Sequence, residues 1–317
     1  MIVALSALLV GFILLIWSAD YLVDNASVVA QRLGVSTFLI GVIIIGFGTS
    51  APEMFVSAMA AIQNKGNLAL GNALGSNITN IGLVLGSAAL IKTLPVSRSA
   101  AKLDIPIVLA TGLLAIFLVS DGILARIDGF ILMFVLLAYL LWSAKSSSNL
   151  SELDTAQNQS DSTSSKSTLN AFVLTIVSIV VLIIASRLLV YGSVVIATHF
   201  GVSELIIGLT IVAIGTSLPE LAAAVAAARK GVHDMIIGNI IGSNVFNTLG
   251  VLGITGTIRA TEIDINALWR DFPIMFLFTV FMLIFALSKR QFSRIEGALL
   301  LSGYVGYICY LFFATIK

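Results

Sequence analysis

The sequence predicts an all-α membrane protein whose ten transmembrane helices form two inverted repeats of five helices each. Three observations predict this fold class. The 317 residues are 58% hydrophobic and only 10% charged, with a mean hydropathy of +1.07, whereas an average soluble domain is about 25% charged. Apolar stretches long enough to cross a bilayer recur along the chain, separated by charged or turn-forming residues. The two halves of the chain also repeat each other at a constant spacing.

The first half contains five apolar stretches. The opening stretch lacks the positive start of a signal peptide and leads into Asp20 and Asp24, so we interpret it as a retained first span. Glycines and Pro52 interrupt the second stretch just before Glu53. The five predicted spans are 3–30, 37–63, 67–91, 102–120 and 126–145.

A hydrophilic segment separates the halves. Residues 146–168 are rich in Ser, Asn, Gln and acidic residues, so they are expected to form a flexible cytoplasmic linker between a first repeat, 1–145, and a second repeat, 169–317. The spans predicted for the second repeat are 169–198, 203–228, 234–257, 267–287 and 294–316.

One polar signature occurs twice. The first copy reads G-T-S-A-P-E at 48–53, then G-N-A-L-G-S-N at 71–77 and Asn80; the second reads G-T-S-L-P-E at 215–220, then G-N-I-I-G-S-N at 238–244 and Asn247. Every residue of the second copy lies 167 positions after its counterpart. Because each half holds an odd number of spans, the second half must enter the membrane from the opposite side, which makes the repeat inverted.

The placement of Lys and Arg predicts the orientation. Eleven of these residues gather on the side of the odd-numbered connections and five on the other side. The positive-inside rule therefore places the odd connections in the cytoplasm and both termini outside it. The short connections favour a prokaryotic cell membrane, the inner membrane in a bacterium with two membranes.

The duplicated signature supplies oxygen atoms inside the bilayer. Glu53 and Glu220 lie in apolar segments, where a carboxylate needs a partner, a cavity or a cation. Pro52 cannot donate a backbone hydrogen bond, so carbonyls near it are free for another donor or a cation. Neither His nor Cys belongs to the cluster, which favours Na⁺ or Ca²⁺ over Zn²⁺, copper or iron.

These residues and motifs resemble the α-repeats of the calcium/cation antiporter superfamily, and most closely its prokaryotic sodium/calcium exchanger branch. The resemblance covers essentially the whole chain. It implies ten transmembrane helices, ion sites among helices two, three, seven and eight, and exchange of Na⁺ for Ca²⁺ by alternating access. In that mechanism helices one and six slide against the rest of the molecule.

The resemblance also implies a set of ion ligands. Carried over position by position, the side-chain ligands are Thr49, Ser50, Glu53, Ser76 and Asn80 in the first repeat and Thr216, Ser217, Glu220, Ser243 and Asn247 in the second. Backbone oxygens of Gly46 and Ala213 complete the set. Some relatives carry Asp where this chain has Asn247. With two carboxylates the cluster balances one Ca²⁺, and three Na⁺ would leave excess positive charge, so the stoichiometry and any use of K⁺ stay open.

Other functions are weighed against exchange. A Ca²⁺/H⁺ antiporter could use the same two glutamates, and a passive cation channel could use the same oxygens. An intramembrane serine hydrolase would need a base near Ser50 or Ser217, but the histidines at 199 and 233 are predicted near span ends. We therefore expect a transporter rather than an enzyme.

The remaining composition restricts the possible partners. A net charge of +1 provides no basic face for nucleic acid. The expected partners are the lipid bilayer and the transported Na⁺ and Ca²⁺, with no cofactor and no obligate protein partner.

Several polar and glycine positions also allow a purely structural interpretation. Glycine pairs four residues apart, at 71 and 75 and at 238 and 242, could let helices approach closely. Asn77 and Asn244 are expected mainly to bond between helices. Asp20 and Arg187 occupy equivalent repeat positions, and we expect each to extend toward its nearer membrane interface.

Overall fold

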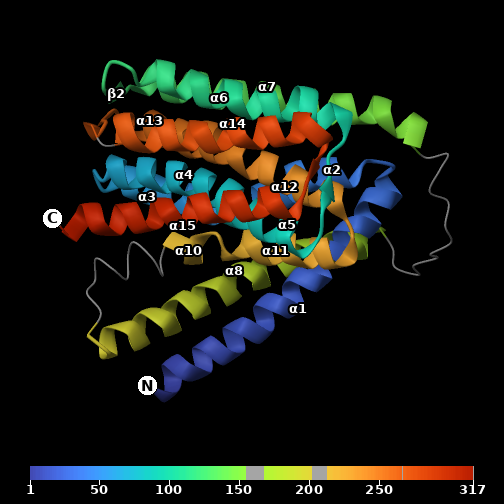
Figure 1. The fold of residues 1–317 in the computed structure, drawn as a ribbon, viewed down its shortest axis with the longest axis horizontal. Coiled ribbons are helices and arrows are strands. Elements are labelled where there is room, and N and C mark those ends of the chain that lie inside the picture. The colour runs from blue at the N-terminus through green and yellow to red at the C-terminus, as the bar shows by residue number, and fades with distance from the viewer. Residues whose placement is uncertain (155–167, 202–212, 266, 317) are drawn as a thin grey trace.

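The computed structural model describes residues 1–154, 168–201, 213–265 and 267–316, which are almost entirely helical (Figure 1). Within these ranges, nine helices are long and apolar enough to cross a membrane. They match nine of the ten predicted spans. The first part of the remaining span, predicted over 203–228, lies outside the described residues.

The elements of the first half follow the predicted spans closely, with short π-helical turns (η) inside several of them. In order they are α1 (Ile2–Leu33), α2 (Thr37–Ile40), η1 (Gly41–Ile45), α3 (Gly46–Ile62), α4 (Gly66–Thr79), η2 (Asn80–Leu85), α5 (Gly86–Ile91), β1 (Leu94–Pro95), η3 (Ala100–Asp104), α6 (Ile105–Leu118), β2 (Ile123–Leu124) and α7 (Arg126–Asp154). Helix α7 continues into the segment predicted as a linker, and residues 155–167 lie outside the described part of the chain.

The described part of the second half has its elements in a corresponding order, with α10 and α11 in place of the single helix α3. They are α8 (Thr168–His199), α10 (Ala213–Thr216), α11 (Leu218–Lys230), α12 (His233–Val245), η5 (Phe246–Val251), α13 (Leu252–Ile258), β3 (Thr261–Glu262), η6 (Ala267–Asp271), α14 (Phe272–Lys289), β4 (Gln291–Phe292) and α15 (Arg294–Ile316).

The helices that carry the polar signature form the core of the molecule. The most apolar window of the span His233–Ile258 is 100% buried, and those of Gly66–Ile91 and Thr37–Ile62 are 72% and 56% buried. In the other candidate spans the buried share is only 17–39%, because their outer faces present large apolar side chains such as Phe117 and Phe134. A bilayer favours this arrangement, in which apolar side chains face lipid and polar groups are bonded within the protein.

Helices α1 and α8 pack against each other at one edge of the bundle, as Figure 1 shows. Each has 32 residues, which corresponds to about 48 Å of α-helix and exceeds a hydrocarbon core of about 30 Å. They approach closely because Gly11 faces the backbone of α8 and Gly192 faces the backbone of α1. Helices this long must tilt in a bilayer of ordinary thickness.

A second close crossing joins the two halves through the core. Added Cβ atoms at Gly238 and Gly242 would collide with the backbone carbonyls of Phe38 and Val42, and one at Gly41 would lie 2.6 Å from the Met235 carbonyl oxygen. Small residues at such positions let two membrane helices meet backbone to backbone. The packing role predicted for the second glycine pair is therefore confirmed, whereas Gly71 and Gly75 have no comparable neighbour among the described residues.

Structural details recur within one residue of the 167-residue spacing of the sequence repeat. The π-helical turns η2 and η3 have counterparts in η5 and η6. Strand β1 pairs antiparallel with β4, and β2 pairs with β3, so each ribbon joins one strand from each half. Asp128 accepts a hydrogen bond from the Ala125 N–H at 2.8 Å, and Glu296 accepts one from the Ser293 N–H at 2.6 Å, which caps α7 and α15 in the same way.

Turns between helices begin at glycines in the left-handed conformation. Gly34 ends α1 with φ 64°, and its N–H bonds to the carbonyls of the last helical turn. Gly231 ends α11 in the same manner with φ 75°. Because these turns are tight, the signature-bearing helices follow directly on their neighbours and their polar faces meet in the core.

Candidate cation site

Helix α3 places three polar side chains of the first signature in the core. Thr49 and Ser50 are fully buried, and Glu53 is 2% exposed. Pro52 lies inside the helix and has no N–H, so the Gly48 carbonyl lacks the donor that an α-helix normally supplies. The signature therefore creates both buried side-chain oxygens and a backbone oxygen with spare capacity.

The second signature breaks its helix more completely. Helix α10 ends at Thr216 and α11 begins at Leu218, with Ser217 between them in a non-helical conformation. Pro219 cannot bond to the Gly215 carbonyl, and the hydroxyl of Ser186 on α8 donates to that oxygen instead at 2.6 Å. Glu220 lies in the first turn of α11 and is 2% exposed.

The neighbouring helices contribute hydroxyl and amide groups. Ser76 on α4 and Asn80 at the start of η2 lie four residues apart, as do Ser243 on α12 and Asn247 in η5, so each pair shares a helix face. All four are buried, and α12 contacts α3, α4 and α11, while α3 also contacts α4 and α11. The Ser243 hydroxyl donates to Asn239 at 3.4 Å.

The two glutamates lie within range of electrostatic interaction with each other. The Thr49 hydroxyl donates to the Ile45 carbonyl at 3.0 Å and also interacts with the Glu220 side chain. Neither carboxylate oxygen of Glu53 has a hydrogen-bond partner in the described part of the chain, and the same holds for Oε2 of Glu220. Two carboxyl side chains that interact electrostatically are therefore buried in the core, with three of their four oxygens unpaired among the described residues.

Further unpaired groups surround the carboxylates. Within the described residues, the hydroxyls of Ser50 and Ser217 and the amide oxygens and nitrogens of Asn80 and Asn247 lack hydrogen-bond partners. Buried polar atoms in proteins are nearly always paired, and a buried unpaired carboxylate is especially unfavourable. The concentration of unpaired oxygens around two negative charges therefore matches what a hard cation such as Ca²⁺ or Na⁺ requires.

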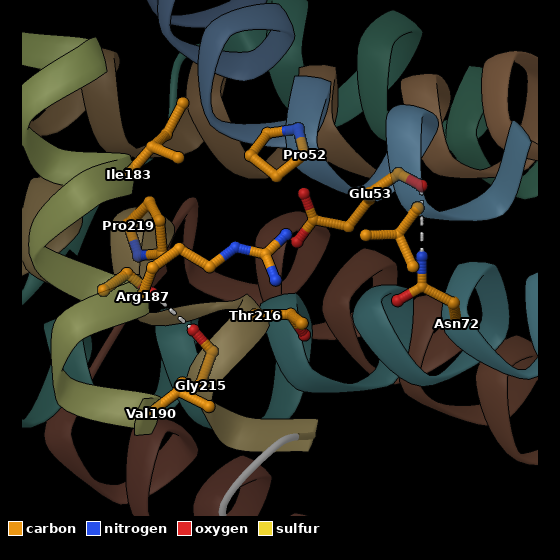
Figure 2. Close-up of a pocket in the computed structure, with 11 residues that line it drawn as sticks. Pro52, Glu53, Asn72, Ile183, Arg187, Val190, Gly215, Thr216 and Pro219 are labelled. Carbon is orange, nitrogen blue, oxygen red and sulfur yellow. Dashed lines mark hydrogen bonds between the residues drawn. The ribbon is translucent and has the colours of Figure 1, made fainter. Parts of the chain in front are cut away.

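A small cavity of about 30 Å³ reaches Glu53 from the side of α8. Figure 2 shows Glu53, Asn72 and Thr216 around it, with Arg187 of α8 pointing toward the Glu53 carboxylate. Asn72 donates to the Glu53 carbonyl at 3.3 Å and to the Ser57 hydroxyl at 3.0 Å. The cavity is lined by both halves of the chain.

Most of the predicted ligand positions lie on these contacting elements. Thr216 is half-buried and lines the cavity with Glu53. Gly46 packs against the backbone of Gly242 and Ser243, so the start of α3 lies against α12. Ala213 begins α10, and its side chain lies outside the described part of the structure.

Three residues with polar or charged side chains at the cavity were absent from the predicted site. Ser186 and Arg187 come from α8, and Asn72 comes from α4. The prediction that Arg187 extends toward a membrane interface is wrong, because its side chain lines the cavity and its charge acts on Glu53. The sequence did contain a signal for this role, because Arg187 is a charged residue within an apolar span.

The two asparagines expected to bond between helices behave differently from each other. The Asn77 amide donates to the Thr248 hydroxyl at 2.7 Å, which joins α4 to η5 as predicted. The Asn244 amide instead donates within its own helix, to the Ile240 carbonyl at 2.7 Å.

Comparisons with known proteins agree with this architecture. The family model described as sodium/calcium exchanger protein matches residues 3–145 and 170–313. The putative antiporter CaxA of Alkalimonas amylolytica is 43% identical over 98% of this chain and 99% of its own length. The inner membrane protein YrbG of Escherichia coli (strain K12) is 36% identical over 99% of this chain and 98% of its own length.

A solved structure shares the fold. The sodium-calcium exchanger NCX_Mj, soaked with zero Na⁺ and Ca²⁺, is similar with a TM-score of 0.85 and 31% sequence identity, over 98% of this chain and 99% of that one. The similarity to these proteins therefore extends over nearly the full length of each chain. The chain belongs to the sodium/calcium exchanger protein family.

Proposed function

We propose that this protein exchanges Na⁺ for Ca²⁺ across the membrane by alternating access. The observation that carries the proposal is the pair of buried glutamates, Glu53 and Glu220, whose oxygens are mostly unpaired among the described residues. A cation would stabilise this arrangement, and its departure would leave two repelling charges in the core. The stability of a conformation that buries both glutamates therefore depends on whether a cation is bound between them.

Most of the proposed ligands of both ions come from the doubled signature, and Gly46 and Ala213 lie just before its two copies. They are hydroxyl, amide, carboxylate and backbone oxygens of Thr49, Ser50, Glu53, Ser76, Asn80, Gly46, Thr216, Ser217, Glu220, Ser243, Asn247 and Ala213. Ca²⁺ takes six to eight oxygens, and Na⁺ uses similar groups, so the two ions compete for overlapping positions. Exchange follows if the site can switch from one side of the membrane to the other only while one of the two ions neutralises the carboxylates.

The proposed architecture is ten transmembrane helices in two inverted repeats, 1–145 and 169–317, joined by a cytoplasmic linker at 146–168. Three features support it: the recurring π-helical turns, the two ribbons that each pair one strand from each half, and the separate family match on either side of the linker. An inverted repeat can present the same site to either side of the membrane in turn.

Helices α1 and α8 are the proposed moving unit. They contact each other extensively, and their outer faces are largely exposed at the edge of the bundle. The signature-bearing helices are instead locked together by glycine contacts between backbones. A peripheral pair can therefore move against a fixed core with little loss of packing.

The proposed location is a prokaryotic cell membrane, with both termini outside the cytoplasm. The name of the Escherichia coli relative places that protein in the inner membrane. The excess of Lys and Arg on the side of the odd-numbered connections supports the orientation.

Transport into vesicles tests the proposal. Purified protein in proteoliposomes loaded with Na⁺ should take up ⁴⁵Ca²⁺, whereas vesicles loaded with K⁺ or choline should not. Uptake that ignores internal Na⁺ would contradict sodium/calcium exchange.

A Ca²⁺/H⁺ antiporter is the second candidate. One observation favours it: protonation of Glu53 would relieve its repulsion from Glu220 without a second metal ion. Uptake driven by an imposed pH gradient in the absence of Na⁺ would support this alternative over the first.

Transport, not catalysis, is the proposed role of the buried serines. His199 ends α8 and His233 begins α12, whereas Ser50 and Ser217 lie in α3 and at the break before α11. A serine nucleophile needs a base beside it. We propose no cofactor and no protein partner, and the substrates are Na⁺ and Ca²⁺.

A further inference from the structure

Arg187 occupies an unusual place for a charged residue. It lies within α8, where it is the single Asp, Glu, Lys or Arg between Thr168 and His199. The side chain is exposed at the mouth of the small cavity, and Glu53 lies behind it, 2% exposed. An arginine within a spanning helix is costly unless it faces a carboxylate, a cavity or water.

The arginine faces the carboxylate of Glu53 across the cavity, although neither Glu53 carboxylate oxygen has a hydrogen-bond partner among the described residues. Figure 2 shows its guanidinium directed across the cavity at that side chain. Among the described residues that line this cavity, Glu53 is the one acidic residue, and its charge interacts with Arg187 as well as with Glu220. The adjacent Ser186 is fixed by its 2.6 Å bond to the Gly215 carbonyl, which holds this part of α8 against the helix break.

The equivalent position of the first repeat carries the opposite charge. Asp20 lies 167 residues before Arg187, and its carboxylate is 3.9 Å from the ammonium of Lys230, which also pairs with Asp24 at 2.7 Å. The first repeat therefore supplies no arginine toward Glu220. Among the described residues, the positive charge of Arg187 acts on Glu53, whereas the equivalent position of the first repeat is acidic.

We propose that Arg187 is a tethered cation that neutralises Glu53 when no ion is bound and that a transported ion must displace from the carboxylate. This inference rests on the proposed exchange function. The guanidinium stays charged and has no lone pair to offer a metal, so it competes with Ca²⁺ for the Glu53 oxygens. With Arg187 in place, the pair of glutamates leaves one net negative charge, not two.

Two consequences distinguish this role from simple packing. Arg187 should weaken cation binding, since a like charge near the site opposes an incoming cation. It should also stabilise the ion-free protein, because it partly compensates two carboxylates that otherwise repel each other in the core. A residue that only fills space would produce neither effect.

Equilibrium binding of ⁴⁵Ca²⁺ to the purified full-length protein in detergent tests the proposal. We expect Arg187→Gln to lower the Kd for Ca²⁺ by about tenfold, the order of effect of one nearby charge. Arg187→Lys keeps the charge and should stay close to the wild type. Arg294→Gln removes the same charge from an exposed position at the start of α15 and should leave the Kd unchanged.

The melting temperature of the same samples provides a second readout. Without Ca²⁺, Arg187→Gln should melt below the wild type, and saturating Ca²⁺ should raise its melting temperature by more than it raises that of the wild type. Wild-type or weaker Ca²⁺ binding by a folded Arg187→Gln protein would overturn the proposal.

A measurement on the unaltered protein applies even if the variants do not fold. Modification by p-hydroxyphenylglyoxal, quantified by mass spectrometry on the peptide that contains Arg187, should become faster with Ca²⁺, because the guanidinium leaves Glu53. Arg294 serves as the internal standard. An unchanged rate at Arg187 in protein that binds Ca²⁺ would contradict displacement, whereas a wild-type protein that binds no Ca²⁺ would instead remove the proposed exchange function.

Discussion

Glu53 and Glu220 occupy equivalent repeat positions but have different surroundings. The Thr49 hydroxyl interacts with Glu220, whereas Glu53 faces Arg187 across the cavity. If both bind cations as proposed, two chemically identical carboxylates are therefore expected to contribute unequally. The doubled signature alone could not indicate this, because it is the same around both residues.

Asn247 offers a second test at the scale of single residues. It is buried in η5, and both of its amide atoms are unpaired within the described chain. We expect Asn247→Asp to tighten Ca²⁺ binding on the order of tenfold, because a third carboxylate adds charge at a hard-cation site. Equilibrium binding of ⁴⁵Ca²⁺ to purified protein measures the effect.

The matched control is Asn64→Asp, which adds the same charge at an exposed position whose backbone conformation Asp tolerates. Unchanged or weaker binding by a folded Asn247→Asp protein would argue that Asn247 lies outside the ligand set.

At this scale the sequence predicted which residues are buried and polar, but not which way a lone charge points. Ten of the predicted ligand residues belong to the doubled signature itself, which stands out against an apolar background. The direction of Arg187 depends on the rotation of α8 about its own axis and on its packing against α10 and α11. Hydropathy patterns carry little information on either.

The elements of the core are held together by contacts between glycines and backbone. Gly242 lies so close to Val42 that an added Cβ would collide with the Val42 carbonyl. We expect Gly242→Ala to destabilise the protein by about 1–3 kcal/mol, the usual cost of overpacking. Thermal unfolding in detergent measures this effect.

Gly306 in α15 is the matched control, since an added Cβ there meets nothing within 4 Å. Gly306→Ala should be neutral or slightly stabilising because alanine favours helix. Equal melting temperatures for the two variants would show that the close crossing is unimportant for stability.

Helix positions were predictable, but their internal irregularities were only partly so. Pro52 and Pro219 indicated both interruptions, yet α3 continues through Pro52 while the second helix breaks at Ser217. The π-helical turns leave no distinct hydrophobic pattern in a chain this apolar. The two ribbons contain two-residue strands, which are too short for alternation to be visible and form because distant loops meet.

Across the whole molecule, the repeat relates elements that pair across the middle. Both ribbons and the central crossing join the first half to the second. If the halves are inverted, the two ends of the molecule are structurally similar, and orientation depends on surface charge rather than on shape. The distribution of Lys and Arg then decides which face lies in the cytoplasm.

The predicted orientation can be measured directly. Alkaline phosphatase fused after residue 317 should be active in intact bacterial cells, and green fluorescent protein fused there should be dark after Sec-dependent export, because the C-terminus is placed outside the cytoplasm. The same reporters inserted between residues 155 and 167 should give the opposite pattern. Fluorescent C-terminal fusions would contradict the orientation.

The central claim is that Glu53 and Glu220 hold the exchanged cations, and the most direct test is equilibrium binding of ⁴⁵Ca²⁺ to purified protein with Na⁺ as competitor. We predict that the wild type binds Ca²⁺ and releases it as Na⁺ rises, that Glu53→Gln and Glu220→Gln each abolish this binding, and that Glu262→Gln, at an exposed position in β3, does not change it. Retention of wild-type, Na⁺-sensitive Ca²⁺ binding by either core variant would contradict the claim.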